Sequence, residues 1–214
     1  MNIKFNSAKD AIAILQILIP FVRQSDGRNL DRIHVFADQN SRAVLEATDG
    51  TRLHIISLPP GFVDLPNGFP QHYAIADPKT ALKIAKINPK DSCEIPCVQI
   101  SSSDFPDTAQ IIPKLDDPTR VGAHTIVVLD PAYLEDLGAA YRIALRWSGS
   151  SETNGITIQC ADPRDPIYCP QVEFLNGARM RHVLMPMVLS DSLKQTSEHL
   201  ASQITRSAQL VEGL

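Results

Sequence analysis

The sequence predicts an α+β fold built from a repeated strand–helix–strand unit. Three short strand-like segments are each followed by a helix-capping residue and then by a helical stretch. This recurrence gives the chain an internal repeat with three starts of the same kind. Short strand candidates, separated by proline and glycine, follow each helix. Repeated helices packed on antiparallel strands are typical of an α+β arrangement.

The first unit begins at the N-terminus. Asn2 to Phe5 alternates between polar and apolar side chains, as a half-buried strand does. Ser7 is the expected N-cap of the first helix, and Asp10 is its expected capping-box partner three residues later. Strands are predicted after this helix at Ile33 to Phe36, Ala43 to Glu46 and Leu53 to Ile56.

The second unit begins with an Asp-Pro helix start. Tyr73 to Ala76 is strand-like, Asp77 is the expected N-cap, and Pro78 takes the first helical position. After this helix the sequence offers one short strand segment, Ile95 to Ile100. The second unit is therefore expected to be abbreviated.

The third unit repeats the Asp-Pro start. Thr125 to Leu129 is strand-like and is followed by Asp130 and Pro131 in the same two roles. Three strand segments are predicted after the third helix, at Gly155 to Gln159, Ile167 to Phe174 and Met180 to Leu189.

The composition is that of an ordinary globular protein. The chain has 214 residues, of which 43% are hydrophobic and 21% charged, enough to bury a substantial core. The net charge of −4 argues against a uniformly basic nucleic-acid binder but allows a local basic face. The longest apolar run, Ala11 to Val22, is too short to cross a bilayer, and the N-terminus has no signal-sequence pattern. We expect a cytoplasmic protein without a membrane segment.

Cysteine and histidine patterns give no sign of catalysis. The spacing of Cys93, Cys97, Cys160 and Cys169 matches zinc ligands poorly and favours reduced structural thiols, with a zinc site as the alternative. The histidines are scattered, and neither a nucleophile triad nor a glycine-rich phosphate loop is present. We expect no enzyme activity, no cofactor and no metal.

The second helix carries a basic stripe. Its lysines are spaced by 4, 3 and 4 residues, which places them on one narrow face. Such a face offers phosphate contacts without base readout, and an ordinary solvated helix face is the alternative. The candidate DNA-facing residues on the second and third helices are Lys79, Lys83, Lys86, Lys90, Arg142 and Arg146.

Three separated segments carry the most specific signal. Thr48 to Leu53 reads Thr-Asp-Gly-Thr-Arg-Leu, Phe105 to Asp107 reads Phe-Pro-Asp, and a strand-like run near residue 185 contains Met-Pro-Met. Taken singly, they indicate a hairpin turn, a loop and a strand. Together and in this order they resemble the bacterial DNA polymerase III β subunit, the DNA sliding clamp.

The resemblance implies a sliding-clamp fold with a pocket for short peptide motifs of polymerases and other clamp-binding proteins. Thr51 stands where the family usually has His, and Gln110 and Ile111 where it commonly has Arg and Val. The apolar side chains would form an adaptable groove wall, and the Thr and Arg of the turn would orient an extended peptide. The pocket residues that the resemblance implies are Leu30, Thr48, Gly50, Thr51, Arg52, Leu53, Pro106, Gln110, Ile111, Val183, Leu184, Met185, Pro186 and Met187.

The same resemblance implies a shortened clamp. Residues 1–115 resemble the middle domain, residues 116–189 resemble the second half of the last domain, and residues 190–214 form an added helical extension. The extension either covers a face left bare by the missing units or occupies the pocket. We expect a homo-oligomeric, DNA-binding polymerase processivity factor or docking platform for replication and repair proteins, and whether its copies close into a ring around double-stranded DNA stays open. The alternative is a reduced clamp relative that binds or inhibits replication proteins without encircling DNA.

Overall fold

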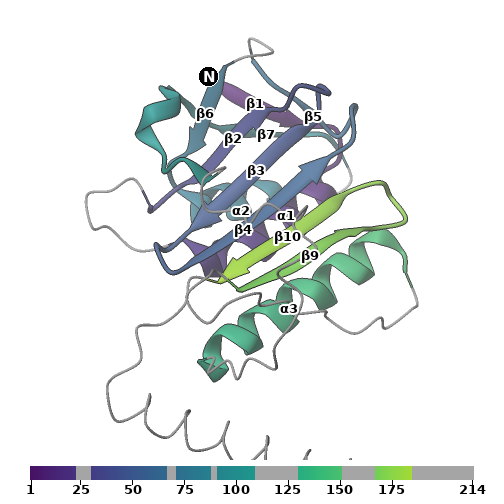
Figure 1. The fold of residues 1–214 in the computed structure, drawn as a ribbon. Coiled ribbons are helices and arrows are strands. Elements are labelled where there is room, and N and C mark those ends of the chain that lie inside the picture. The colour runs from purple at the N-terminus through teal and green to yellow at the C-terminus, as the bar shows by residue number, and fades with distance from the viewer. Residues whose placement is uncertain (23–29, 67–70, 88–90, 109–129, 151–166, 185–214) are drawn as a thin grey trace, which may run out of the picture.

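The computed structural model describes residues 1–22, 30–66, 71–87, 91–108, 130–150 and 167–184 (Figure 1). The helices are α1 (Ala8–Leu18), α2 (Pro78–Ile87) and α3 (Pro131–Ser148), with short 3-10 turns η1 (Ile19–Phe21) and η2 (Ser102–Asp104). The strands are β1 (Asn2–Phe5), β2 (Ile33–Ala37), β3 (Ala43–Thr48), β4 (Arg52–Leu58), β5 (Val63–Asp64), β6 (His72–Ile75), β7 (Cys93–Pro96), β8 (Val98–Ile100), β9 (Ile167–Glu173) and β10 (Arg179–Leu184).

Within these ranges the strands form two antiparallel sheets. The larger sheet has seven strands in the order β8-β6-β2-β3-β4-β10-β9, and the smaller has three in the order β5-β1-β7. β10 pairs with β4 from Arg179 opposite Ser57 to Leu184 opposite Arg52. The last strand of the third unit therefore continues the sheet of the first unit, although most of the chain separates the two in sequence.

The predicted strands in the described ranges are confirmed, with described ends that differ by at most two residues, and β5 was not predicted. The exception is the segment Ile95 to Ile100, which contributes to two strands. The chain bends at Cys97, whose N–H donates to the Met1 carbonyl at 3.0 Å. β7 joins the smaller sheet and β8 the larger one, so this short segment connects the two sheets.

Two of the three predicted helix starts in described regions follow the expected chemistry. Asp77 Oδ1 accepts from the Thr80 N–H, and Asp130 Oδ1 accepts from the Ala132 N–H, both at 2.9 Å. The capping box predicted for α1 is wrong, because Ser7 makes no side-chain cap bond. Asp10 instead accepts from Trp147 Nε1 on α3 at 2.8 Å. A tertiary contact has taken the carboxylate that the local pattern assigned to the cap.

The helices form a layer on one face of the larger sheet, with α1 in contact with both α2 and α3 (Figure 1). Alternate strand residues point toward this layer and are buried, among them Val35, Leu45 and Ile56. They pack with Ile14, Leu15 and Leu18 of α1, each 0% exposed. Hence the intervening residues of the same strands point to the opposite face of the sheet.

Several predictions concern residues that the structure does not describe. These are the strands at residues 125–129, 155–159 and 185–189 and the extension 190–214. The described thiols of Cys93 and Cys97 are buried and free, and burial raises the pKa of both. Cys160 and the side chain of Cys169 lie outside the description. None of the described helices combines the length and apolar character needed to span a bilayer.

Candidate functional site

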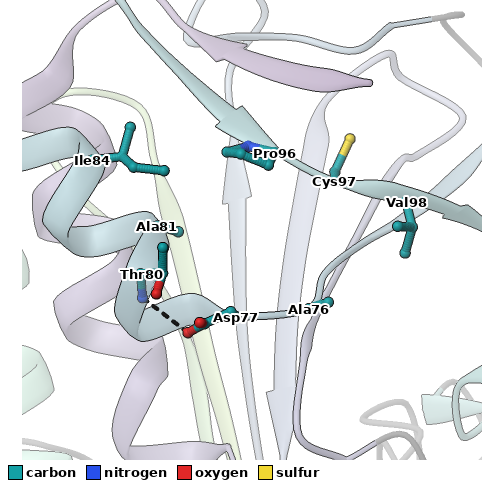
Figure 2. Close-up of a pocket in the computed structure, with 8 residues that line it drawn as sticks. All are labelled: Ala76, Asp77, Thr80, Ala81, Ile84, Pro96, Cys97 and Val98. Carbon is teal, nitrogen blue, oxygen red and sulfur yellow. Dashed lines mark hydrogen bonds between the residues drawn. The ribbon is translucent and has the colours of Figure 1, made fainter.

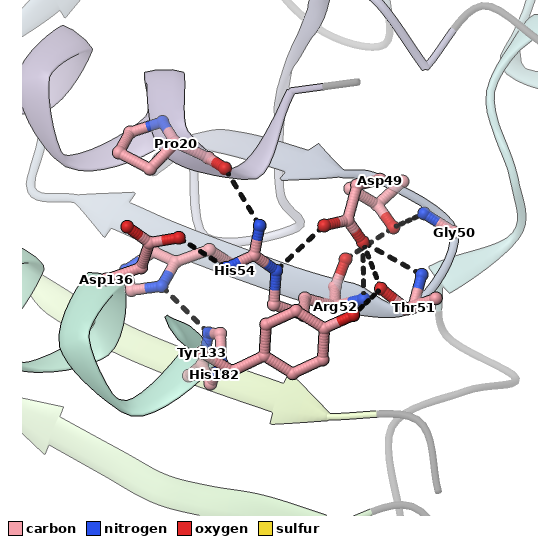
Figure 3. A network of polar contacts seen from close by, with 10 residues as sticks. Pro20, Asp49, Gly50, Thr51, Arg52, His54, Tyr133, Asp136 and His182 are labelled. Carbon is pink, nitrogen blue, oxygen red and sulfur yellow. Dashed lines mark hydrogen bonds and ion pairs between the residues drawn. The ribbon is translucent and has the colours of Figure 1, made fainter. Parts of the chain in front are cut away.

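Arg52 is the centre of the polar network at the end of β4 (Figure 3). Its Nε donates to Asp49 Oδ2 at 2.7 Å, and its Nη1 donates to Asp136 Oδ2 of α3 at 2.6 Å. Its Nη2 donates to the Pro20 carbonyl at 3.1 Å. The side chain is only 8% exposed. One guanidinium thus ties together the turn before β4, the 3-10 turn after α1, and the start of α3.

Aromatic rings complete the surroundings of Arg52. The guanidinium carbon lies 4.5 Å from the Tyr133 ring centroid and 5.1 Å from that of Phe21. The planar guanidinium suits this combination, because it stacks on rings while its edge donates hydrogen bonds. The sequence predicted that Arg52 orients a bound peptide. In the structure its described partners are internal, so its contact with a peptide stays a prediction.

The turn before Arg52 is held by Asp49. Asp49 Oδ1 accepts from the backbone N–H groups of Thr51 and Arg52 at 2.9 and 2.8 Å. Burial raises the pKa of Asp49, but hydrogen bonds from Thr51 and Arg52 outweigh it and hold the pKa below its ordinary value. Gly50 has φ +89°, which favours glycine, and a Cβ there would lie 3.5 Å from Leu30 Cδ1. The Leu30 side chain therefore lies next to this turn, and its contact with a peptide stays a prediction.

Three predicted pocket residues form a row across the sheet. Thr48 of β3 lies opposite Leu53 of β4, and Leu53 lies opposite Val183 of β10. By strand alternation the row is on the face away from the helices, whereas Arg52 and Leu184 point to the helix side. All three are buried, with Val183 0% and Leu53 2% exposed. The row joins the first unit to the third, which are adjacent only in the tertiary structure.

The Phe-Pro-Asp segment lies on the same face of the sheet. The Phe105 ring centroid is 4.7 Å from that of His34, and Thr108 Oγ1 donates to Glu46 Oε2 at 2.9 Å. Glu46 and Thr48 are two residues apart on β3, so this segment approaches the row. Pro106 itself is exposed. The other predicted pocket residues, Gln110, Ile111, Met185, Pro186 and Met187, lie outside the described residues.

Glu46 also belongs to a buried polar chain that the sequence analysis missed. Glu46 Oε1 is 2.7 Å from His34 Nδ1, and His34 Nε2 is 2.9 Å from His72 Nδ1. Burial and the neighbouring His34 lower the pKa of His72, although Glu46 raises it. The chain crosses β3, β2 and β6, so it depends on strand register. The described residues include no group of three side chains arranged to hold a metal ion.

A second histidine contact was also missed. His54 and His182 lie opposite each other on β4 and β10, with their Nδ1 atoms 3.0 Å apart and both side chains 0% exposed. The Phe21 ring stacks on His54 at 4.5 Å. Burial, and then the positive charge of Arg52, lower the pKa of His182 to about 3. Burial, His182 and Arg52 place the pKa of His54 well below its ordinary value.

The predicted basic residues lie on two helices at opposite sides of α1. Lys79, Lys83 and Lys86 of α2 are exposed, as are Arg142 and Arg146 of α3, and Lys90 lies outside the described residues. Arg146 and Trp147 line a groove of about 450 Å³ between α1 and α3, together with Lys9 and Gln16 of α1. Lys9 therefore adds a positive charge in the same groove as Arg146. The sequence analysis did not include Lys9 among the candidate DNA-facing residues.

Comparison with solved structures identifies the architecture. The DNA polymerase III subunit beta of Borrelia burgdorferi matches with a TM-score of 0.62 at 14% identity. The chain has the sliding-clamp fold. The match covers 89% of this chain but only 63% of the Borrelia chain, so the clamp fold is shortened here. No protein-family model and no curated protein sequence matches the chain.

Two further clamp structures have peptides bound. The Helicobacter pylori beta clamp bound to a DNA ligase peptide matches with a TM-score of 0.58 at 14% identity, over 87% of this chain and 66% of that one. A. fulgidus PCNA bound to the C-terminal region of FEN-1 matches with a TM-score of 0.53 at 11% identity, over 89% of this chain and 100% of that one. Identities this low establish the fold alone.

The first prediction concerns the buried guanidinium. Arg52→Lys removes the fork that serves three acceptors and leaves Asp136 and the Pro20 carbonyl without their donors. We expect the free energy of unfolding to fall by about 2–4 kcal/mol, because the buried cation at position 52 would lose most of its hydrogen bonds. Urea denaturation measures it. Arg179→Lys is the matched control, since its pair with Glu173 is largely exposed and should contribute less than about 1 kcal/mol. Equal effects at both positions would contradict the role given to Arg52.

The second prediction concerns pH. The pKa of His182 is about 3 in the folded chain, below the ordinary value of 6.5, so the unfolded chain binds more protons between these values. The free energy of unfolding is therefore highest above pH 6.5, where the histidine is neutral in both states. It falls as the pH is lowered below 6.5, by up to about 1.4 kcal/mol per pH unit for each such histidine. Urea denaturation at a series of pH values above about 4.5 avoids most carboxylate titration.

The variants isolate the source of this pH dependence. His54→Leu combined with His182→Leu removes both buried imidazoles and should flatten most of the slope. His72→Gln is the control, because His72 is partly exposed and should account for a minor part. An unchanged slope in the double variant would show that the pair does not titrate with unfolding.

Proposed function

We propose that this protein is a sliding-clamp-like docking platform that binds replication or repair proteins through a hydrophobic peptide pocket. The observation that carries the proposal is the Thr48–Leu53–Val183 row. It extends from the first unit to the third on the sheet face that also holds the Phe-Pro-Asp segment. Two of the three motifs, and the strand that precedes the third, therefore contribute described residues to one face of the sheet.

The chemistry of the region supports peptide binding. Leucine, valine and proline supply an apolar wall, and the predicted Met185 and Met187 would add adaptable side chains. A DNA ligase peptide and the C-terminal region of FEN-1 are the partners present in two structures of the same fold. By analogy, the partners proposed for this chain are DNA polymerases and other proteins with short clamp-binding motifs. The proposed role is non-catalytic.

Two forms of this function remain distinct. In the first, copies assemble into a ring around double-stranded DNA and act as a processivity factor. Four copies of a three-unit chain would give the twelve units of a clamp ring. Exposed Lys79, Lys83 and Lys86 support this form because they offer phosphate contacts. In the second, the chain binds or inhibits replication proteins without encircling DNA. The net charge of −4 favours it, because an acidic balance opposes attraction to DNA.

The third prediction tests the pocket. A fluorescein-labelled DNA ligase peptide of the kind bound by the Helicobacter clamp should bind the full chain in a fluorescence anisotropy titration. Leu53→Ala and Met187→Ala should each weaken binding by about tenfold, the effect of losing one well-buried apolar contact. Leu134→Ala is the control, because Leu134 is 42% exposed on α3. Retained secondary structure by circular dichroism excludes unfolding, and equal affinity in all four proteins would refute the pocket.

The fourth prediction separates the ring from the reduced clamp. Native mass spectrometry of the full chain at micromolar concentration should give a closed oligomer if the ring forms, and a strict monomer would end the ring model. Charge reversal by Lys83→Glu with Lys86→Glu should then lower affinity for a double-stranded oligonucleotide and reduce its salt dependence. The single variant Lys4→Glu, at an exposed position, is compared with the single variant Lys83→Glu as the control for net charge. Unchanged DNA affinity would remove α2 from the DNA-facing surface.

A further inference from the structure

An apolar cleft lies in the second unit, away from the candidate pocket (Figure 2). Its volume is about 190 Å³. One wall is α2, with Thr80, Ala81 and Ile84, and the other is the strand segment Pro96, Cys97 and Val98. Ala76 and Asp77 close one end. The Asp77 carboxylate is already used to cap α2, where it accepts from the Thr80 N–H.

The cleft has the size and chemistry of a slot for one side chain. An apolar cavity of about 150 Å³ is large enough to bind benzene. A cleft somewhat larger than this accepts a bulky aliphatic or aromatic side chain. Two exposed apolar side chains belong to the elements that form its walls: Val98 is 47% exposed, and Ile87, one helical turn beyond Ile84, is 82% exposed. Exposed apolar side chains on such elements add to the surface that a partner could bury.

Among the described residues, the strand wall of the cleft lies at the edge of both sheets. β2 follows α1 and pairs with β6, the first strand of the second unit. In the same way, β7 follows α2 and pairs with β1, the first strand of the first unit. β2 pairs on its other side with β3, whereas β7 has no second strand partner among the described residues. β8 likewise ends the larger sheet as described. An open edge offers backbone donors and acceptors to an added extended strand.

The charge beside the cleft indicates the sign of its partner. The surface of α2 beside the cleft carries three exposed lysines, Lys79, Lys83 and Lys86. Each lysine directly precedes one residue of the row Thr80, Ile84 and Ile87. The lysine stripe and the apolar line are thus adjacent on the helix surface. A partner that fills the cleft would bring its flanking residues close to these ammonium groups, and carboxylates there would be favoured electrostatically.

We propose that this cleft is a second docking site, which binds an extended segment of a partner protein with one bulky apolar side chain flanked by acidic residues. The apolar side chain enters between Ile84 and Val98, the peptide backbone runs along the edge from β7 to β8, and the acidic flanks contact the lysines of α2. DNA phosphates could also contact these lysines, but DNA has no apolar side chain to fill the cleft. The proposal does not depend on the candidate pocket of the first and third units.

The experiment uses a small series of fluorescein-labelled decapeptides and the full chain in anisotropy titrations. The first peptide has a central Phe with Asp and Glu flanks, the second has Ala at the centre, and the third keeps Phe but has Lys flanks. We expect saturable binding of the first peptide and about tenfold or more weaker binding of the other two. An unlabelled DNA ligase peptide in excess should not displace the first peptide.

Two variants locate the binding. Thr80→Trp fills the mouth of the cleft from an exposed position, and Val98→Asp places a like charge against the acidic flanks. Both should weaken binding by about tenfold or more. Leu134→Asp is the matched control for Val98→Asp, because the two side chains are 42% and 47% exposed, and it should leave affinity unchanged.

Any of several results would overturn the proposal. These are no saturable binding of the acidic Phe peptide, equal binding of all three peptides, unchanged affinity in Thr80→Trp, or displacement by the DNA ligase peptide. A different outcome would be that the full chain binds no peptide while Val98→Asp changes its oligomeric mass. That outcome would identify the cleft as a contact between copies of this chain and would reject the proposed partner peptide.

Discussion

The arrangement of the first and third units depends on one buried guanidinium. Arg52 holds the turn through Asp49, the end of the first helical segment through the Pro20 carbonyl, and α3 through Asp136. These contacts fix α3 beside β4 and accompany the pairing of β10 with β4. A buried cation is costly unless it is fully bonded, so the three acceptors must be in place together. That requirement selects one arrangement of segments that are far apart in the chain.

Strand alternation then divides the chemistry between two faces. The helix side receives Arg52, His54, His182 and Leu184, where burial and the neighbouring positive charge keep the imidazoles neutral. The opposite side receives Leu53, Thr48 and Val183, with Phe105 and Thr108 nearby. Residues that are adjacent in a motif thus have different tasks. One side of the Thr-Asp-Gly-Thr-Arg-Leu turn stabilises the joint between units, and the other lines the candidate pocket.

The shortened second unit has a different consequence. In the first unit, β3 and β4 extend the sheet beyond β2, and β10 and β9 extend it further. After α2, the described residues of the second unit form only β7 and β8, which lie at the sheet edge beside α2. The bend at Cys97 sends this short segment into both sheets. The apolar cleft lies at that bend, between α2 and the segment that joins the two sheets.

The sequence by itself determined the Asp-Pro helix starts, most of the described strands and the exposed lysines of α2, because these depend on capping, periodicity and solvation within a few residues. It also placed the clamp motifs in order, and the fold agrees with them. It did not determine that Asp10 bonds Trp147, that Arg52 is buried, or that His54 meets His182. Those facts depend on which strands pair and in what register. Only the tertiary structure decides this, because a shift of one residue would send each of these side chains to the other face.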